Sequence, residues 1–337
     1  MSTFTTSAVS EAGKATALTV VVALVVAYMP LGAPLVLLLL PLPLAYLTSR
    51  RGVRVGVAAM VSAGVLAAIL TGPSNGTLTL FVGGFVGVTL GSALRRDLSF
   101  ASTLLLTTLA AAVALVLTGA VGWVVSGMSV KEYQTLLDQA LSTAADFYRR
   151  AGVSSQTISQ ATDEFRRMVQ QIPYLLPALF GLSGLSTAGV STGLAAIIFP
   201  RMGQSLGENM AFSRFRLHWS FAYGFIVGLG LLVVARFFPD PQLVRMAGLN
   251  LLLFFGGLFF VQGLAVTHWY AVTRRIVGGS RTLLYLVAVL LQLVLQLTTW
   301  AGLFDTWFDY RTRFAPRGPG PESTVPLNPP SNTENKE

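Results

Sequence analysis

The sequence predicts an all-α protein, a polytopic transmembrane helix bundle. Of its 337 residues, 53% are hydrophobic and only 11% are charged, whereas soluble domains carry about a quarter charged residues. The charged residues also lie between long apolar runs, and a run of about 18 or more residues crosses the bilayer as a helix. We therefore expect about nine transmembrane helices, with an amphipathic helical hairpin inserted among them.

The expected helices follow the apolar runs. They span about residues 15–29, 31–47, 54–71, 76–94, 99–126, 173–199, 218–237, 247–272 and 282–303. The first two are ambiguous, because 33 residues (15–47) are too long for one ordinary span and short for two. Pro30 and Pro34 interrupt the run and favour a tight pair of short helices. A single tilted span is the alternative, and it would move the N-terminus across the membrane.

The runs divide the chain into four regions. These are an N-terminal membrane region (1–127), an amphipathic insertion (128–172), a C-terminal membrane region (173–303) and a tail (304–337). The tail is rich in Pro, Gly, Ser and Asn, so we expect it to be disordered. A signal peptide is not expected, because a second apolar stretch follows the first at once.

Arginines predict the orientation of the bundle. They follow every second expected helix, as Arg50, Arg51, Arg54, Arg95, Arg96, Arg201, Arg214, Arg216, Arg274, Arg275 and Arg281. Basic loops remain on the cytoplasmic side, so we expect a bacterial inner-membrane protein with these loops in the cytoplasm and residues 128–172 outside. The five basic residues of the insertion oppose this assignment, although five acidic residues balance them.

The insertion reads as two amphipathic helices. Ser129 and Glu132 have the spacing of a capping box. Apolar residues recur at helical spacing at Tyr133, Leu137, Leu141, Ala144 and Tyr148, and again at Ile158, Ala161, Phe165, Met168 and Ile172, before Pro173 starts the next span. The hairpin is either a lid or partner-binding element, or it rests on the lipid headgroups or on the protein itself.

Small residues one helical turn apart mark surfaces of close helix contact. They are Ala23 and Ala27, Gly83, Gly87 and Gly91, Gly189 and Gly193, and Gly224 and Gly228. Two interpretations remain open: packing inside the bundle, or docking of another membrane subunit.

Amides inside the expected spans are the best candidates for a polar ligand pocket. They are Asn250, Gln262, Gln292 and Gln296. A buried amide in hydrocarbon needs hydrogen-bond partners, so these residues either join neighbouring helices or line a cavity.

Several classes of function are not expected. None of the expected spans carries Asp, Glu, Lys or Arg between its interfacial ends, which argues against an ion-driven pump. The sequence has no Walker A motif, nucleophile elbow or zinc-protease motif, and it has no cysteine. We expect no enzymatic activity, cofactor or metal; a membrane-embedded lipid enzyme is the remaining alternative. The net charge of +9 indicates loops beside anionic headgroups rather than nucleic-acid binding.

Segments of the eighth expected helix resemble a known family. Two segments of this helix are Asn250-Leu251-Leu252-Leu253 and Gln262-Gly263-Leu264-Ala265-Val266. Four other features accompany them: Pro41-Leu42-Pro43-Leu44, Arg51-Gly52, the insertion ending at Pro173 and the stretch 212–219. Together these features resemble the YybS-like family of predicted bacterial membrane proteins. The resemblance covers roughly residues 14–303 and implies no established activity. That family is distantly similar to the substrate-binding components of energy-coupling-factor transporters, in which a small-residue face like Ala23 and Ala27 docks a coupling subunit.

These observations favour a non-enzymatic, transporter-like component that binds a small molecule and depends on partner subunits or a second copy of itself. The alternative is an envelope scaffold or assembly factor that acts through its helix faces and its hairpin. A cavity lined by the amides would favour the first, and amides bonded only to neighbouring helices would favour the second.

Overall fold

The chain is a polytopic all-α bundle, as the sequence predicts. The computed structural model describes residues 6–29, 33–207, 210–239 and 241–313, and this part of the chain contains helices and no strand. Within it, seven helices are long and apolar enough to cross a membrane: Thr6–Tyr28, Val53–Thr71, Pro73–Arg95, Phe100–Ser126, Ser155–Arg201, Gln242–Thr273 and Gly278–Leu295. A shorter apolar helix covers Phe221–Phe237.

The N-terminal segment contains one long helix and two short ones, which is neither the expected pair of short helices nor a single span over 15–47. Helix α1 (Thr6–Tyr28) packs against α2 (Ala33–Leu37) and α3 (Leu42–Arg51). The Glu11 carboxylate accepts two hydrogen bonds from the Arg51 guanidinium, at 2.7 and 2.6 Å, so α1 starts at the end of the bundle where α3 stops. The expectation of one helix over 31–47 is wrong, because residues 38–41 form a turn that leads into Pro41 and Pro43. Neither piece reaches the length of a span.

The rest of the N-terminal region consists of long apolar helices. Helix α4 (Val53–Thr71) turns at Gly72 into α5 (Pro73–Leu78), which continues through the π-helical segment η1 (Thr79–Phe85) into α6 (Val86–Arg95). Gly72 has a φ of 94°, a conformation that glycine tolerates without strain. Helix α7 (Phe100–Ser126) follows, with the Ser99 side chain accepting a hydrogen bond from the Ser102 amide at its N-terminus.

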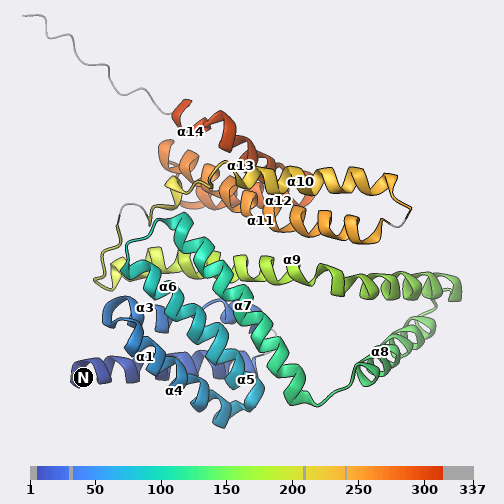
Figure 1. Cartoon of the computed structure of the whole chain (residues 1–337), viewed down its shortest axis with the longest axis horizontal. Helices are drawn as coiled ribbons and strands as arrows, with labels where there is room; N and C mark the ends of the chain where they lie inside the picture. The colour runs from blue at the N-terminus through green and yellow to red at the C-terminus, as the bar shows by residue number, and fades with distance from the viewer. Residues whose placement is uncertain (1–5, 30–32, 208–209, 240, 314–337) are drawn as a thin grey trace, which may run out of the picture.

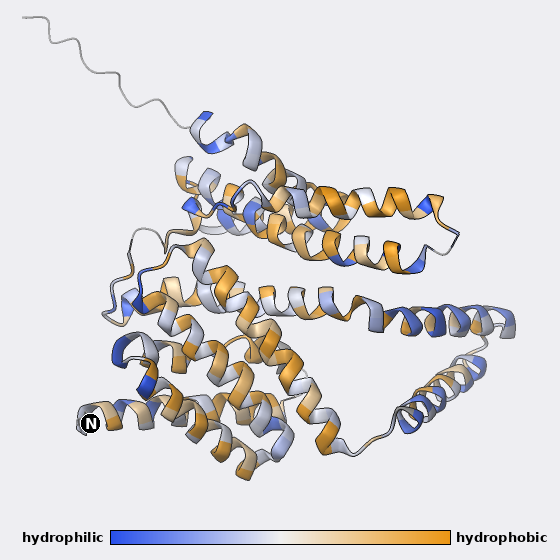
Figure 2. Cartoon of the chain, in the orientation of Figure 1, coloured by the Kyte–Doolittle hydropathy of each residue, from blue (hydrophilic) through white to orange (hydrophobic). Residues whose placement is uncertain are grey.

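The insertion contains α8 (Val130–Arg150) and the first part of α9 (Ser155–Arg201). Ser129 and Glu132 form the predicted capping box at the start of α8. The prediction of a new helix at Pro173 is wrong, because α9 is one helix of 47 residues that contains Pro173, Pro177 and Pro200. Figure 1 shows α9 running from the bundle into the hairpin, and Figure 2 shows polar residues concentrated in that projecting part.

The C-terminal region combines the long helix α11 with several shorter elements. They are the turn η3 (Phe212–Arg214), α10 (Phe221–Val234) with η4 (Ala235–Phe237), α11 (Gln242–Thr273), α12 (Gly278–Leu295), α13 (Leu297–Phe308) and α14 (Tyr310–Arg313). The expected helix 282–303 is broken at Gln296, whose φ is 53°. The predicted tail starts too early, because residues 304–308 and 310–313 are helical; residues 314–337 lie outside the described part.

The four arginine-rich loops gather at one end of the bundle, as predicted. Arg95 donates to a backbone carbonyl at the end of α3, and Ser49 of α3 donates to Gln204 in the loop after α9. In the same loop, the ring of Phe212 lies 5.5 Å from that of His268 near the end of α11. The main buried core connects α3, α6, α7, α9, α10, α11 and α13, and the hairpin extends from the opposite end of α9 (Figure 1).

Candidate functional site

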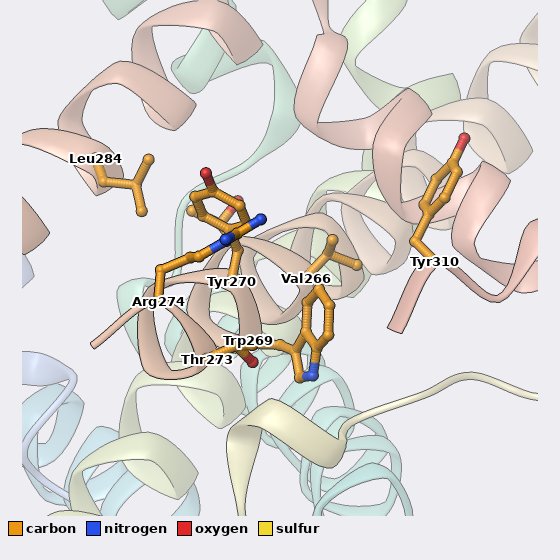
Figure 3. Close-up of a pocket in the computed structure, with 8 residues that line it drawn as sticks. Val266, Trp269, Tyr270, Thr273, Arg274, Leu284 and Tyr310 are labelled. Atoms are coloured by element: carbon orange, nitrogen blue, oxygen red, sulfur yellow. The ribbon is translucent and has the colours of Figure 1, made fainter. Parts of the chain in front are cut away.

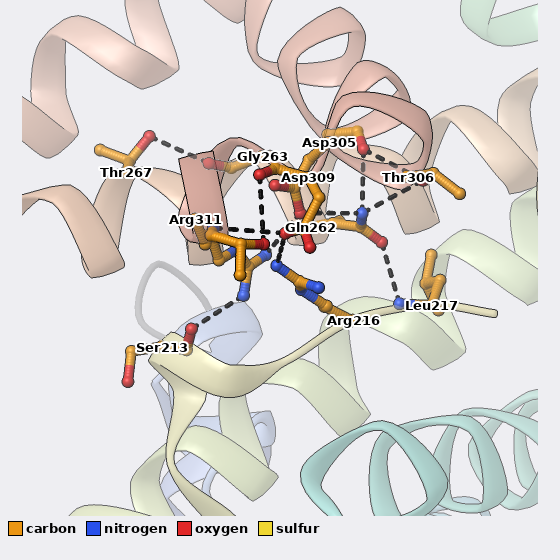
Figure 4. Close-up of polar contacts among 12 residues, drawn as sticks. Ser213, Arg216, Leu217, Gln262, Gly263, Thr267, Asp305, Thr306, Asp309 and Arg311 are labelled. Carbon is orange, nitrogen blue, oxygen red and sulfur yellow. Dashed lines mark hydrogen bonds and ion pairs between the residues drawn. The ribbon is translucent and has the colours of Figure 1, made fainter. Parts of the chain in front are cut away.

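A buried polar cluster lies at the arginine-rich end, where α11, α13, α14 and the loop before α10 meet (Figure 4). Gln262 of α11 lies at its centre and is 1% exposed. Its Oε1 accepts from the Leu217 amide at 3.0 Å, and its Nε2 donates to the Gly302 carbonyl at 3.0 Å and to Thr306 Oγ1 at 3.2 Å. Both polar atoms of the amide therefore bond groups of neighbouring segments, which agrees with the interpretation that it joins helices.

An ion pair beside Gln262 joins α13 to α14. Asp305 and Arg311 lie 3.0 Å apart, and their side chains are 0% and 6% exposed. Arg311 also donates to the Ser213 carbonyl at 2.8 Å. Burial lowers the pKa of the Arg311 guanidinium, and the Asp305 charge opposes that effect. The pair thus holds α14 against α13, and the hydrogen bond to Ser213 holds α14 against the loop that precedes α10.

The chain reverses between the two charges. Asp309 ends α13 with a φ of 45°, and this turn carries Arg311 back towards Asp305. The Asp309 carboxylate is bonded to Arg216, and this hydrogen bond lowers the pKa of Asp309 to about 2. Both side chains of the second pair are more than 40% exposed. The cluster thus has a buried pair and a solvated pair side by side.

The sequence predicted Gln262 as a buried polar residue but not the ion pair beside it. Asp305 and Arg311 fall in the segment assigned to the tail, although Phe304, Trp307 and Phe308 continue the apolar character of the preceding helix. That continuation was the available signal. Among the described residues, no three His, Cys, Asp or Glu side chains gather as a metal site requires.

Gln292 and Gln296 lie at the break between α12 and α13. The Oε1 of Gln292 accepts from the amide of Thr299 at 3.0 Å and from its hydroxyl at 3.1 Å, so it caps the first turn of α13 across the break. Gln296 is exposed and occupies the left-handed position between the helices. The two amides therefore do not converge on a common cavity.

Asn250, on the neighbouring helix α11, forms hydrogen bonds with backbone groups of α9. Its Oδ1 accepts from the Ala178 amide at 2.9 Å, and its Nδ2 donates to the carbonyls of Tyr174 at 2.7 Å and Met246 at 2.8 Å. In a regular α-helix, the amide of residue 178 and the carbonyl of residue 174 bond to each other. Asn250 links them beside Pro177, and it also borders an apolar cleft of about 560 Å³ between α7, α9 and α11.

The small-residue faces lie mostly inside the bundle. A Cβ on Gly91 would lie 2.4 Å from the Ala45 carbonyl oxygen, and Gly83 and Gly87 face the same segment around α3. Gly224 and Gly228 face α11, and Ala23 is buried in a cluster with Leu40 and Ala67. Ala27 is half-buried, whereas a Cβ on Gly193 would meet nothing within 4 Å and one on Gly189 would just reach Leu104.

A second cleft lies against α11 near its last turns (Figure 3). It measures about 370 Å³ and is lined by Val266, Thr267, Trp269, Tyr270, Thr273, Arg274, Leu284 and Tyr310. The Arg274 guanidinium lies 5.7 Å from the centre of the Tyr270 ring, which is within cation–π range. Aromatic rings with a cation are typical of the membrane interface.

The hairpin carries an apolar groove, which we call the hairpin groove. It measures about 570 Å³ and is lined by Leu137, Ala140, Leu141, Ala144, Ala145, Tyr148, Val153, Thr157, Ile158, Ala161, Thr162 and Phe165. Tyr148 is 54% exposed and Phe165 40% exposed, and Ile158 is the one buried residue of the described hairpin. The two helices leave most of their apolar faces uncovered.

Replacing Gln262 with Leu is expected to lower the free energy of unfolding by about 1–3 kcal/mol, because the buried Leu217 amide would lose its acceptor. Thermal unfolding in mild detergent measures the effect. The control is Gln296→Ala, which removes an exposed amide and should change stability by less than about 0.5 kcal/mol. Equal effects of the two substitutions would contradict the assigned role of Gln262.

Comparison with known proteins identifies a family. A family model described as Predicted membrane protein (DUF2232) matches residues 17–306. The match includes both membrane regions and the hairpin, close to the range of the expected resemblance. No curated protein and no solved structure matches the chain.

Proposed function

The chain belongs to this family of predicted membrane proteins, and from that premise we propose that it is a non-enzymatic, multi-pass membrane scaffold or assembly factor. The bundle anchors it in the bilayer, and the hairpin groove docks an amphipathic helix of a partner protein. We place it in a bacterial inner membrane with its arginine-rich loops in the cytoplasm and the hairpin outside.

The length of α9 is the observation that carries this proposal. Its 47 residues correspond to about 70 Å at 1.5 Å per residue, whereas the hydrocarbon core is about 30 Å thick. The part from residue 155 to residue 172 therefore extends about 27 Å beyond the span that follows it. Because this part continues the axis of the span (Figure 1), it projects from the bundle.

The chemistry of the hairpin supports docking rather than lipid contact. Its five basic and five acidic residues cancel, so it lacks the excess cationic charge that draws amphipathic helices to anionic headgroups. Two helices with an uncovered apolar groove are completed by a third amphipathic helix, which is a common mode of peptide recognition. Salt bridges Arg149–Asp146 and Arg166–Asp138 are on the exposed surface and leave the groove open.

The amides favour this proposal over a polar ligand pocket. The side chains form hydrogen bonds with backbone and side-chain groups of neighbouring segments, as seen for Gln262, Gln292 and Asn250. Asn250 uses both amide protons in this way. A polar ligand in the bundle would have to compete with these internal partners.

A transporter-like component is the second candidate. The cleft of about 560 Å³ beside Asn250 favours it, because ligand pockets commonly have such volumes and apolar walls. In that case the narrower resemblance to the YybS-like family, and through it to energy-coupling-factor components, would apply, and separate ATPase subunits would supply the energy. The cleft would accept an apolar small molecule.

Photocrosslinking from the hairpin in living cells tests the scaffold proposal. A photoreactive residue at Leu141, inside the groove, is expected to capture one defined polypeptide, whereas the same residue at Gln139, on the opposite face of α8, is not. Ala161→Asp should abolish the capture at Leu141, because a charge in the groove opposes burial of an apolar helix. Capture from both faces alike, or crosslinks only to lipid, would contradict the proposal.

A further inference from the structure

A lateral cleft opens between α1 and α9 at the arginine-rich end, and we call it the interfacial cleft. Helix α1 and the end of α9 form two of its walls, and α3 with the turn before it forms the third. The cleft measures about 460 Å³ and is lined by Glu11, Lys14, Ala15, Leu18, Val22, Leu39, Leu42, Pro43, Tyr46, Leu47, Ile198, Phe199 and Met202.

The chemistry of the interfacial cleft changes along its length. Leu18, Val22 and Leu39 make its inner part apolar, whereas Lys14 and Tyr46 lie nearer the ends of their helices at its mouth. Residues Lys14, Leu18 and Val22 recur every four positions on α1 and so share one face of that helix. One wall of the cleft thus runs from a cation to aliphatic side chains.

The mouth of the cleft carries excess positive charge. The Glu11 carboxylate is bound by Arg51 through two hydrogen bonds. Lys14 and Arg50 also lie close enough to interact with it electrostatically, so three cations share one carboxylate. The Arg50 guanidinium donates to the Tyr46 hydroxyl at 2.9 Å, and its centre lies 5.6 Å from the centre of that ring. Two cations therefore remain available beside an apolar channel.

We propose that the interfacial cleft is a binding site for an anionic phospholipid. One acyl chain occupies the apolar part between α1 and α9, and the phosphate group lies between Lys14 and Arg50. The combination of an apolar channel and excess positive charge matches the two ends of such a lipid. Anionic lipids are also enriched in the leaflet that contacts basic loops, where each Lys or Arg contributes to their attraction. This inference does not depend on partner docking by the hairpin.

Native mass spectrometry of the full chain tests the site with two probes, phosphatidylglycerol and phosphatidylcholine of equal chain length. The wild-type protein is expected to retain one phosphatidylglycerol in preference to phosphatidylcholine. Lys14→Gln and Arg50→Gln should each reduce that preference about fivefold, the factor expected for loss of one cation near an anionic lipid. Lys14→Arg should preserve it, which separates loss of charge from damage to the fold.

Two further variants make the result decisive. Leu18→Trp places a bulky ring in the cleft and should lower the occupancy of both lipids. Lys131→Gln removes one charge from the hairpin and should leave the preference for phosphatidylglycerol unchanged. If Lys131→Gln lowers the preference as much as Lys14→Gln, or if Leu18→Trp has no effect on occupancy, the bound lipid is general annular lipid and the site is refuted.

Discussion

Replacing Asp305 with Asn is expected to lower the free energy of unfolding by about 3–5 kcal/mol, because the substitution leaves the Arg311 charge buried without its counter-ion. The two side chains are 0% and 6% exposed, so water cannot compensate the remaining charge. Movement of the unpaired Arg311 towards solvent would also break its hydrogen bond to the Ser213 carbonyl, which connects α14 to the loop before α10. Unfolding in a detergent titration measures the change.

The double variant Asp305→Leu, Arg311→Met distinguishes the effect of losing the whole ion pair from the effect of leaving one charge unpaired. An apolar replacement of both partners removes the uncompensated charge, so most of the stability should return. Arg216→Gln is the matched control at the exposed pair with Asp309 and should cost less than about 1 kcal/mol. If the exposed and the buried substitutions have equal effects, the Asp305–Arg311 pair is not the stabilising contact.

Replacing Gly263 with Ala is expected to destabilise the C-terminal region by about 3 kcal/mol, near the upper end of the usual range for overpacking. A Cβ at this position would lie 1.9 Å from the carbonyl oxygen of Thr298, and one on Gly302 would lie 2.0 Å from the carbonyl oxygen of Phe259. Helices α11 and α13 therefore touch backbone to backbone, and neither side can yield by moving a flexible side chain. Thermal unfolding in detergent reports the loss.

Gly193→Ala is the control for this substitution. A Cβ there would meet nothing within 4 Å, so the stability should stay equal or rise by up to about 1 kcal/mol, the helix-propensity difference between the two residues. A destabilisation by Gly193→Ala that matches that of Gly263→Ala would mean that glycine acts through backbone freedom, and would contradict the close crossing of α11 and α13.

The contrast between the glycines shows what a sequence can reveal. Gly83, Gly87 and Gly91 were recognisable because one helix repeats them every turn, and they do face a close neighbour. Gly263 and Gly302 lie on two helices, and each meets the backbone of the other helix. A contact between two glycines on different helices cannot be predicted from the spacing of residues within either helix. The spacing rule also selected Gly193, which has open space around it.

The polar residues show a similar limit. Apolar runs predicted the bundle, because burial in a bilayer acts on each segment separately. Arginines after every second run predicted the arginine-rich end. The partners of Gln262 lie 45 and 40 residues away along the chain, at Leu217 and Gly302. The sequence therefore showed that Gln262 needed partners without showing which. The sequence also could not show that Asn250, on another helix, bonds the Tyr174 carbonyl and the Ala178 amide beside Pro177 in the continuous helix α9.

The position of Asn250 gives α9 the properties of a lever with a pivot. Its amide forms hydrogen bonds with the α9 backbone at Tyr174 and Ala178, where the transmembrane part meets the projecting arm, residues 155–172. An arm of about 27 Å converts a tilt of about 10° at this pivot into a displacement of about 5 Å at its tip. Because Asn250 is on α11, which also carries Gln262 of the polar cluster, one continuous helix contacts both the α9 backbone at the pivot and the cluster at the arginine-rich end.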